Sequence, residues 1–219
     1  PLSANRPKPL LPIVDRPVLA RVLDLLAAAG FAEAAILTFH EEARIREALA
    51  HLAPRGLALR FVHADRDLGS AGAVARAVEL LGVEECLAIS ADIVCDFDLA
   101  DLVAFHRERA AAATIALTRV ANPLQFGIVI VDSRGRVLRF LEKPNWGEVF
   151  SDTVNAGIFV LSAGALSRVP RDEPVAFAAD LFPRLLADGA PLYGCVQAGY
   201  WRDIGDPDTY LAVHADVFA

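Results

Sequence analysis

The stretch Cys86-Leu87-Ala88-Ile89-Ser90-Ala91-Asp92 decides the fold that this sequence predicts. The segment 86–90 is uncharged and largely apolar, which is typical of a central strand buried on both faces of a sheet. Sheets of such strands are mostly parallel, and in open parallel sheets ligands bind beyond the carboxyl ends of the strands. Asp92 stands two residues past Ser90, so the sequence predicts that its carboxylate faces a ligand.

Strand and helix patterns alternate on both sides of this strand. They predict strands at 34–38, 57–62, 86–90 and 114–118, and helices at about 17–29, 41–52, 73–81 and 98–112. Later patterns predict a hairpin of 128–131 with 137–140, strands at 154–161, 192–196 and 200–204, and helices at 177–186 and from 206 onward. Repeated strand–helix units place helices on both faces of a sheet. The predicted fold class is therefore α/β, with a doubly wound, mostly parallel Rossmann-like sheet and added antiparallel hairpins.

The bulk properties favour one cytoplasmic domain and exclude several classes of partner. A chain of 219 residues can bury one substantial core, so we expect a single domain over residues 1–219. The net charge of -7 argues against nucleic acid, and no apolar run approaches the roughly 20 residues of a membrane-spanning helix. No export leader is visible. Cys86, Cys95 and Cys195 are widely spaced, without metal-ligand spacing, which indicates reduced thiols.

A lysine fixed between two prolines is the first candidate site residue. Lys8 stands in the run Pro7-Lys8-Pro9-Leu10-Leu11-Pro12. Proline has a fixed φ and no N–H, so the backbone around Lys8 is stiff and its ammonium is held at little conformational cost. A rigid lysine on an apolar run suits the binding of a phosphate group.

Two aspartates are candidates for a magnesium site. Asp92 follows the central strand, and Asp203 lies in the glycine- and aromatic-rich stretch 199–205. Mg²⁺ prefers one or two carboxylates together with substrate phosphates, and a divalent ion would relieve the repulsion between two acids. The structural alternatives are that Asp92 caps a turn and that Asp203 forms an ion pair with Arg202.

A second acidic motif, Asp96-Phe97-Asp98, matches the D-x-D pattern of nucleotide-sugar glycosyltransferases. A helix pattern begins directly after it, at Leu99, so we expect Asp98 to cap that helix rather than to hold a metal. None of the five histidines lies at ligand spacing from another histidine or from a cysteine, so the sequence predicts no histidine metal site.

A glycine-rich segment, Leu68-Gly69-Ser70-Ala71-Gly72-Ala73, joins a predicted strand to the start of a helix. Glycines let a flat base lie against the backbone, and free N–H groups at a helix start can bind its edge. The structural alternative is an ordinary helix start that happens to contain two glycines. The segment is not a P-loop, because no Gly-Lys-Ser/Thr sequence follows it.

Polar residues and glycines in the later strands are candidates for sugar recognition. Glu142-Lys143-Pro144 presents another lysine fixed by proline, although the motif taken alone favours a solvated strand end. Asn155-Ala156-Gly157 is unusual within a strand, because Asn and Gly are poor strand formers, and Asn offers the donor and acceptor that sugar hydroxyls require. Gly127 marks a strand start where the backbone approaches another group closely.

Taken in order, these motifs resemble the motif series of the sugar-1-phosphate nucleotidyltransferase family over essentially the whole chain. The series consists of Pro7-Lys8-Pro9-Leu10-Leu11-Pro12, Leu68-Gly69-Ser70-Ala71-Gly72, Ala91-Asp92-Ile93-Val94-Cys95-Asp96, Phe126-Gly127-Ile128-Val129, Glu142-Lys143-Pro144, Asn155-Ala156-Gly157 and Trp201-Arg202-Asp203-Ile204-Gly205. Within the family, the Asp92 segment, the Asn155 segment and the run 148–153 are most similar to mannose-1-phosphate guanylyltransferases.

The resemblance implies a reaction and a role for each candidate residue. The reaction transfers a nucleotidyl group from a nucleoside triphosphate, with GTP favoured, to a sugar-1-phosphate, with mannose-1-phosphate favoured, and releases pyrophosphate. By resemblance, Lys8 contacts nucleotide or pyrophosphate oxygens and Lys143 binds the sugar phosphate, so both lysines are catalytic. Asp92 and Asp203 are the implied Mg²⁺ ligands. The remaining implied roles are nucleotide binding by Gly69, Ser70, Ala71, Gly72 and Asp92, and sugar-phosphate binding by Gly127, Glu142, Lys143, Asn155 and Gly157.

The same resemblance leaves alternatives open. The first strand of the family and its Gly-rich signature loop normally precede the position of Pro1, so we expect the given sequence to lack them. A non-catalytic, nucleotide-sugar-binding regulatory subunit is therefore one alternative. Another is a glucose-1-phosphate thymidylyl-, uridylyl- or adenylyltransferase. Association into a homo-oligomer and a further C-terminal domain are both compatible with the resemblance.

Overall fold

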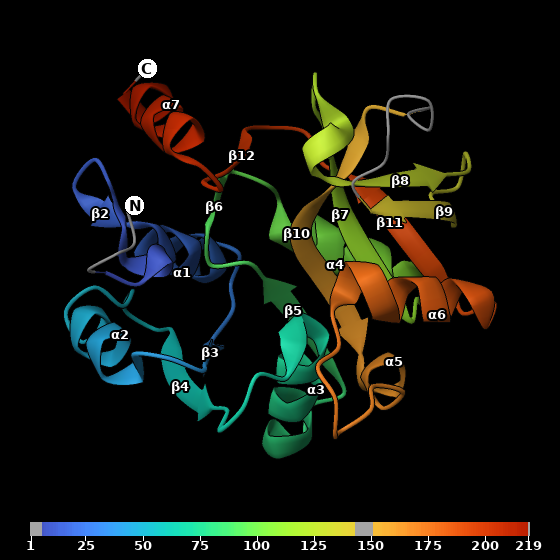
Figure 1. Ribbon diagram of the computed structural model, residues 1–219, viewed down its shortest axis with the longest axis horizontal. Helices are drawn as coiled ribbons and strands as arrows, with labels where there is room; N and C mark the ends of the chain where they lie inside the picture. Colours follow the sequence, from blue (N-terminus) through green and yellow to red (C-terminus); the bar gives the residue numbers. More distant parts are fainter. Residues whose placement is uncertain (1–5, 143–150, 219) are drawn as a thin grey trace. The chain divides into compact units, whose positions relative to one another are not determined.

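A computed structural model describes residues 6–142 and 151–218 (Figure 1). The chain divides into two compact units. The first unit consists of residues 1–65, 90–99 and 199–219, and the second of residues 66–89 and 100–198. Each unit has its own cluster of buried apolar side chains.

The first unit combines one parallel pair of strands with two antiparallel pairs. Its elements are η1 (Lys8–Leu10), β1 (Pro12–Ile13), β2 (Arg16–Pro17), α1 (Val18–Ala28), β3 (Glu33–Thr38), α2 (Glu42–Leu49), β4 (Ala58–His63), β6 (Ile93–Cys95), β12 (Trp201–Asp203) and α7 (Pro207–Phe218). β3 and β4 pair in parallel on either side of the crossover through α2. β1 pairs antiparallel with β2. β6 and β12 also pair antiparallel, which brings together two segments that are far apart in the sequence.

The second unit is built around one sheet. Its elements are α3 (Gly69–Leu81), β5 (Glu85–Ile89), α4 (Leu99–Glu108, which begins at the boundary), β7 (Ala113–Arg119), η2 (Pro123–Gln125), β8 (Gly127–Val131), β9 (Val137–Glu142), β10 (Thr153–Ser162), α5 (Ala163–Leu166), the π-helical η4 (Phe177–Leu181), α6 (Phe182–Ala187) and β11 (Leu192–Val196). The strand order is β11-β7-β10-β8-β9, with β5 also paired to β10. Since β5 and β7 both run antiparallel to β10, and β11 runs parallel to β7, the strands β5, β7 and β11 share one direction.

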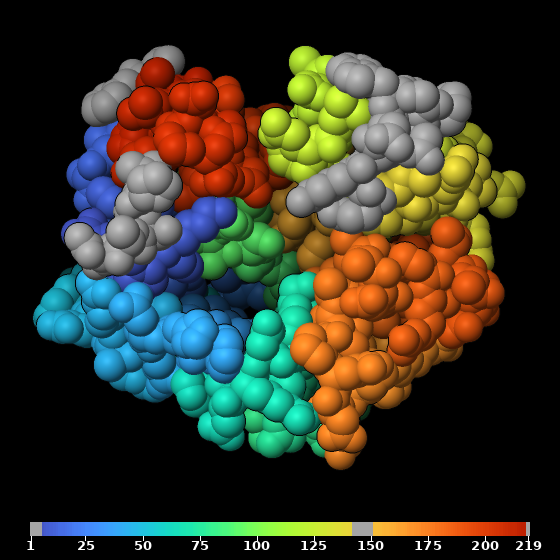
Figure 2. Space-filling model, in the orientation of Figure 1, coloured from blue at the N-terminus to red at the C-terminus, as the bar shows by residue number. Residues whose placement is uncertain are grey.

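Helices cover both faces of this sheet. The Nδ1 atom of His106 in α4 lies 2.9 Å from Oγ1 of Thr114 in β7. The next residue of the strand, Ile115, packs instead in the buried cluster that contains Phe182 of α6. Successive strand residues point to opposite faces, so α4 and α6 lie on opposite sides of the sheet. Figure 1 shows α6 (orange) in front of the strands, and the orange atoms of this part of the chain lie on the near face of the second unit in Figure 2.

Two of the later elements differ in arrangement from the sequence prediction. The predicted hairpin is confirmed as β8–β9 at one edge of the sheet, but β10 runs antiparallel inside the sheet. A strand buried on both faces has the same apolar pattern in either direction, so its direction was not predictable. The predicted helix 177–186, in which Pro183 is expected to produce a kink, is a π-helical segment followed by α6, and Pro183, which has no N–H to donate, occupies the first turn of α6.

β5 has a hydrogen-bonded neighbour on one edge only. It pairs with β10, and no strand within the described residues pairs with its other edge. All residues of β5 are partly exposed, although Cys86, Leu87, Ala88 and Ile89 are apolar. Within the described residues, β5 is therefore less buried than the prediction of burial on both faces requires.

No helix within the described ranges is both long and apolar enough to cross a membrane.

Cys86, Cys95 and Cys195 are free thiols. Burial raises the pKa of Cys86 to about 12 and that of Cys95 to about 11. Both groups are therefore protonated at neutral pH and are poor nucleophiles.

Candidate active site

The lysine between two prolines begins a short 3₁₀ helix. The N–H groups of Leu10 and Leu11 donate to the carbonyls of Pro7 (2.9 Å) and Lys8 (3.0 Å), which fixes the turn. The turn buries Leu10 and leaves the Lys8 side chain 37% exposed. The Lys8 ammonium donates to the carboxylate of Asp92, so the structure brings two of the predicted site residues into direct contact.

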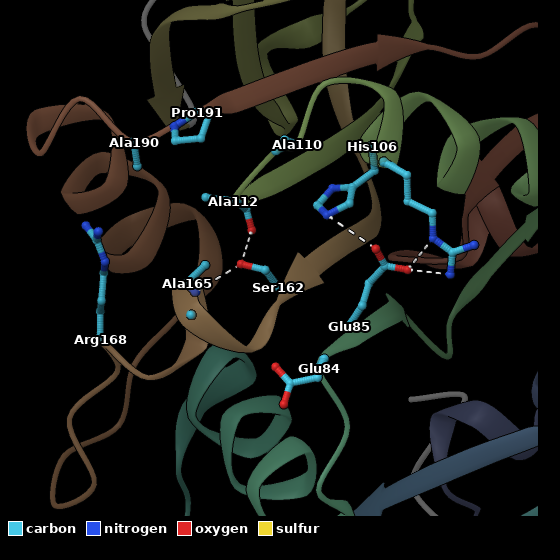
Figure 3. A pocket seen from close by; sticks show the side chains of 13 residues that line it. Glu84, Glu85, His106, Ala110, Ala112, Ser162, Ala165, Arg168, Ala190 and Pro191 are labelled. Carbon is cyan, nitrogen blue, oxygen red and sulfur yellow. Dashed lines mark hydrogen bonds and ion pairs between the residues drawn. The ribbon is translucent and has the colours of Figure 1, made fainter.

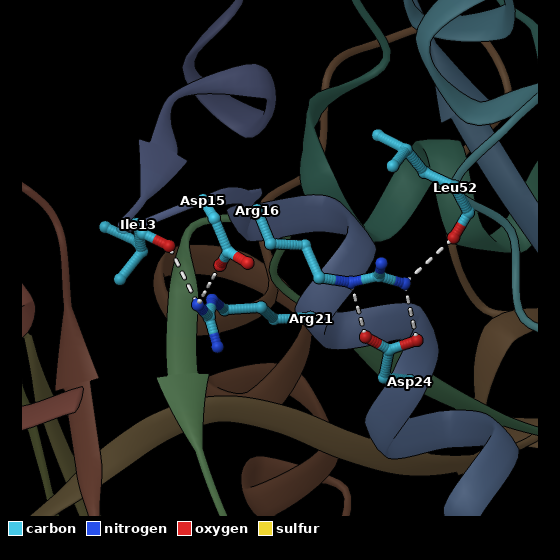
Figure 4. A network of polar contacts seen from close by, with 6 residues as sticks. All are labelled: Ile13, Asp15, Arg16, Arg21, Asp24 and Leu52. Atoms are coloured by element: carbon cyan, nitrogen blue, oxygen red, sulfur yellow. Dashed lines mark hydrogen bonds and ion pairs between the residues drawn. The ribbon is translucent and has the colours of Figure 1, made fainter. Parts of the chain in front are cut away.

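Two arginines hold the chain that follows Lys8 (Figure 4). Arg21 of α1 donates to the carbonyl of Ile13 (2.8 Å). Arg16 donates to the carboxylate of Asp24 in α1 (2.8 Å) and to the carbonyl of Leu52 beyond α2 (3.0 Å). The segment that follows Lys8 is therefore fixed to α1 by side-chain hydrogen bonds.

The pairing of β6 with β12 places Asp203 beside Asp92. Asp203 pairs with Ile93 in the ladder, and the N–H of Ile204 donates to the carbonyl of Asp92 (3.0 Å). Burial and the negative charge of Asp92 raise the pKa of the Asp203 carboxyl, whereas the Lys8 ammonium opposes this shift. One lysine and two acids of the first unit therefore form a single electrostatically coupled cluster.

A small apolar cluster joins the segments that carry these charges. It consists of Leu11, Ile13, Val18, Ile204 and Val213, with Val14, Val94 and Tyr210 packed against it. Ile13 and Val213 are fully buried. Burial of a side chain of this size stabilises the fold by about 1.5–3 kcal/mol. Because Val213 belongs to α7, this helix is part of what holds the charged cluster in place.

The two acids fit a magnesium ion. Within the described residues, no group of three or more His, Cys, Asp or Glu side chains is arranged to hold a metal. Two carboxylates alone suit an ion that keeps several waters and binds substrate phosphates, as Mg²⁺ does. The raised pKa of Asp203 reflects in part the charge of Asp92 beside it, and a divalent ion would remove that cost.

The predicted base-binding segment forms the first turn of α3, and its N–H groups already have partners. The N–H of Gly69 donates to the carboxylate of Asp67 (2.8 Å). The N–H groups of Ala71 and Gly72 both donate to the carbonyl of Val175 (2.8 and 3.2 Å). The expectation of free N–H groups at these positions is therefore wrong, because the chain around Val175 occupies them.

The 175–177 segment also covers the other two residues of this turn. Gly69 has a φ of +68°, and a Cβ atom there would lie 2.5 Å from the carbonyl oxygen of Val175. The Oγ atom of Ser70 accepts a hydrogen bond from the N–H of Phe177 (3.1 Å). Nucleotide binding by residues 69–72 stays a prediction, and it requires this contact to open.

The predicted sugar-binding residues lie on three strands of the second unit. Gly127 begins β8 and pairs with Glu142, the last residue of β9. In β10 the Oδ1 atom of Asn155 accepts from the N–H of Gly157 (2.8 Å), where the register shifts and Gly157 has a φ of 74°. This irregularity explains Asn and Gly within a strand. Lys143 lies outside the described residues, and the sugar-binding roles stay predictions.

A cavity of about 650 Å³ lies elsewhere in the second unit (Figure 3). It is lined by Glu85, the first residue of β5, and by Pro191 and Ser162 at the same end of the sheet. Glu85 binds Arg107 (2.7 Å) and faces His106 (3.8 Å), whose pKa is lowered by burial. The cavity contains none of the predicted site residues and lies at the amino ends of the parallel strands, away from the expected ligand side.

Sequence reasoning missed the contribution of α7. Its start was predicted from Asp206-Pro207, but no local pattern links Val213 or Asp216 to partners at the other end of the chain. The spacing of Tyr210 and Val213 was the one indication that a face of this helix is packed against the rest of the unit, since residues three apart share a face. By contrast, the sequence shows the D-x-D motif that begins at Asp96, but it does not show that Asp96 binds Tyr200.

Comparison with known proteins supplies the family. The sequence matches the nucleotidyl transferase family model over residues 1–219. The chain belongs to the nucleotidyl transferase family. It is 34% identical over 218 residues to a mannose-1-phosphate guanylyltransferase of Mycobacterium tuberculosis (strain ATCC 25618 / H37Rv), covering 99% of this chain and 60% of that protein. It is 32% identical over 214 residues to a mannose-1-phosphate guanylyltransferase catalytic subunit beta of Drosophila pseudoobscura pseudoobscura, covering 96% and 57%.

This member of the nucleotidyl transferase family thus spans somewhat less than two thirds of the length of these relatives. Solved structures share its fold. HddC from Yersinia pseudotuberculosis superposes with a TM-score of 0.84 at 21% identity, over 99% of this chain and 94% of that one. A putative glucose-1-phosphate thymidylyltransferase from Bacillus anthracis gives a TM-score of 0.86 at 20% identity, over 98% and 88%. The predicted α/β, Rossmann-like fold class and the predicted family are confirmed.

Proposed function

We propose that this protein transfers a nucleotidyl group from a nucleoside triphosphate to a sugar-1-phosphate, with GTP and mannose-1-phosphate as the favoured pair. The observation that carries the proposal is the cluster of Lys8, Asp92 and Asp203, in a chain similar to mannose-1-phosphate guanylyltransferases. Phosphoryl chemistry of this kind depends on alignment and charge neutralisation and needs no nucleophilic side chain. A lysine beside two acids supplies charges of the required kind.

In the proposed reaction an oxygen of the sugar phosphate attacks the α-phosphorus of the triphosphate. The bond from that phosphorus to the oxygen bridging to the β-phosphate breaks, and pyrophosphate leaves with the electron pair. Lys8 exchanges its bond to Asp92 for phosphate oxygens and holds its positive charge against them. Asp92 and Asp203 would hold Mg²⁺, which when bound neutralises part of the phosphate charge.

The second unit supplies the remaining roles in this proposal. Gly127, Glu142, Asn155 and Gly157 contact the sugar, and Lys143 binds its phosphate. The first turn of α3 contacts the base once the 175–177 segment gives way. These assignments rest on the resemblance of the motifs, and the register shift after Asn155 supports one of them, because it interrupts the pairing of β10 with β7 between Asn155 and Phe159.

The test is pyrophosphate release by the purified full-length protein with GTP, dTTP, UTP, CTP or ATP, each combined with mannose-1-phosphate or glucose-1-phosphate. We expect the fastest release with GTP and mannose-1-phosphate. Asp92→Asn and Asp203→Asn should each lower the rate by at least roughly 100-fold, because each removes a charge that faces the reacting phosphates. Asp188→Asn is the matched control, since it removes a carboxylate paired with Arg168 in the second unit.

Each outcome of this grid has a distinct meaning. Faster release with glucose-1-phosphate and another nucleotide would keep the reaction and change the substrates. Binding of GDP-mannose without release from any pair would support the alternative of a non-catalytic binding protein. Full activity in Asp92→Asn or Asp203→Asn would refute the assignment of the charged cluster.

A further inference from the structure

The strand that carries Asp203 is too short to hold its own position. β12 has three residues, and it pairs with the three residues of β6 in a separate two-stranded sheet. A two-stranded ribbon is marginally stable on its own even when it is longer than this. The position of Asp203 relative to Asp92 therefore depends on contacts that lie outside the ladder.

The first of these contacts comes from Asp96, which follows β6. Its Oδ1 atom accepts a hydrogen bond from the N–H of Tyr200 (2.6 Å), and its own N–H donates to the carbonyl of Tyr200 (3.2 Å). Asp96 thus closes the end of the ladder opposite to Asp92. Gly199 makes room for it: the φ there is +117°, and a Cβ atom would lie 2.2 Å from Oδ1 of Asp96.

The second contact comes from Asp216, near the end of α7. Its Oδ2 atom accepts a hydrogen bond from the hydroxyl of Tyr200 (2.7 Å) and forms an ion pair with Arg202, whose Nε atom lies 2.8 Å away. Burial, together with this bond to Asp216, raises the pKa of Tyr200 to about 12, so the hydroxyl keeps the proton that it donates. Side chains alternate between the two faces of a strand, so Tyr200 and Arg202 point to the same face of the ribbon. Asp203, the next residue after Arg202, points to the opposite face.

The helix that carries Asp216 is itself fixed to the segment that follows Lys8. The hydroxyl of Tyr210 donates to the carbonyl of Pro12 (2.6 Å), and Nδ1 of His214 accepts from the N–H of Val14 (3.3 Å). The side chain of Val213 is fully buried on the same side of the helix. α7 therefore connects the lysine-bearing segment with the strand that carries Asp203.

From this geometry we propose that Asp96 and Asp216 are positioning residues, which clamp Tyr200 and Arg202 and thereby hold Asp203 beside Asp92 at the cation site. Neither clamp residue contacts the reacting groups, and each acts through β12. The inference rests on the proposed function, because that function includes the cation site. It also gives a role to Asp96, the first acid of the D-x-D motif, which is not part of the cluster of Lys8, Asp92 and Asp203.

The test measures binding of Mn²⁺, used as a probe for Mg²⁺, to the full chain by electron paramagnetic resonance. We expect Asp216→Ala and Asp96→Ala each to weaken Mn²⁺ binding by roughly 10-fold or more, the usual effect of losing an outer-shell partner. Asp188→Ala, which breaks a similar carboxylate–arginine pair in the second unit, should bind Mn²⁺ like the wild type. Melting curves show whether each variant is folded.

A second readout separates positioning from general damage. In Asp216→Ala, raised Mg²⁺ should restore the rate of pyrophosphate release, since the clamp affects cation affinity rather than the chemical step. If that variant does not fold, Tyr200→Phe is measured instead; it leaves Arg202 on Asp216 and should weaken Mn²⁺ binding by about 2–5-fold, as expected for one lost hydrogen bond.

The outcomes distinguish this inference from the proposed function. If the wild type binds Mn²⁺, Asp203→Asn does not, and the Asp96 and Asp216 variants bind like the wild type, the clamp is refuted while the cation site stands. If the wild type itself does not bind Mn²⁺, the cation site of the proposed function fails and the clamp fails with it.

Discussion

Replacing Gly69 by alanine tests how tightly the chain around Val175 closes on the start of α3. Gly69 has a φ of +68°, and a Cβ atom there would lie 2.5 Å from the oxygen of Val175 and 2.7 Å from its carbonyl carbon and nitrogen. Gly82, just past the other end of the same helix, has a φ of +64°, but a Cβ atom there would have nothing within 4 Å. Gly82→Ala therefore reports backbone strain alone, and Gly69→Ala reports the same strain plus a clash.

The expected difference follows from these contacts. A left-handed residue other than glycine costs about 1–2 kcal/mol, and this applies to both variants. In Gly69→Ala the carbonyl of Val175 must also move away from the N–H groups of Ala71 and Gly72, and each lost hydrogen bond costs about 1 kcal/mol. We expect losses of about 3–4 kcal/mol for Gly69→Ala and about 1–2 kcal/mol for Gly82→Ala. In a chain of 219 residues, the difference of about 2 kcal/mol corresponds to about 4–8 °C in melting temperature.

Urea denaturation followed by far-ultraviolet circular dichroism measures both losses, and thermal melts provide the second comparison. The far-ultraviolet spectrum of each variant before denaturation shows whether its overall secondary structure is that of the wild type. Losses that agree within about 0.5 kcal/mol would refute the argument, because the contact with Val175 would then contribute nothing to stability.

Other charged and apolar groups give further tests by the same urea titration. Since the pKa of Asp203 is raised in the folded state, its ionised form destabilises the fold, and Asp203→Asn should raise the free energy of unfolding at pH 7 without added cation. That gain should vanish below about pH 3, where the wild-type carboxyl is protonated in both states. Burial lowers the pKa of His106, so unfolding takes up a proton below about pH 6.5; stability should fall there, and by less in His106→Gln. Val213→Ala removes two buried methyl groups and should cost about 2 kcal/mol.

The charged cluster was predictable because each member carries a local signal. Lys8 is marked by its two prolines, Asp92 by the apolar strand before it, and Asp203 by the glycines and aromatics around it. The rule that ligands bind beyond the carboxyl ends of strands then places Asp92 on the ligand side. The structure brings all three together, although their chemical roles stay predictions.

The partners of these residues were not predictable, because they come from distant parts of the chain. Asp96 and Tyr200 are 104 residues apart, and no residue pattern near Asp96 predicts that the strand after Tyr200 pairs beside it. Likewise, the carbonyl of Val175 reaches the start of α3 across a long stretch of sequence and removes the free N–H groups that the local pattern of Gly69–Gly72 indicates. Local patterns report propensity, whereas these contacts depend on tertiary packing.

One edge of β5 has no strand partner within the described residues, and this has a consequence for what can pair with it. Residues 86–89 carry no charge, and their backbone N–H and C=O groups on that edge have no strand partner within the described ranges. Such an edge is a template on which a strand from another molecule can add, and charged side chains are the usual protection against it. β5 lacks that protection beyond Glu85, so this edge can accept one further strand, either from another part of the same protein or from a second molecule.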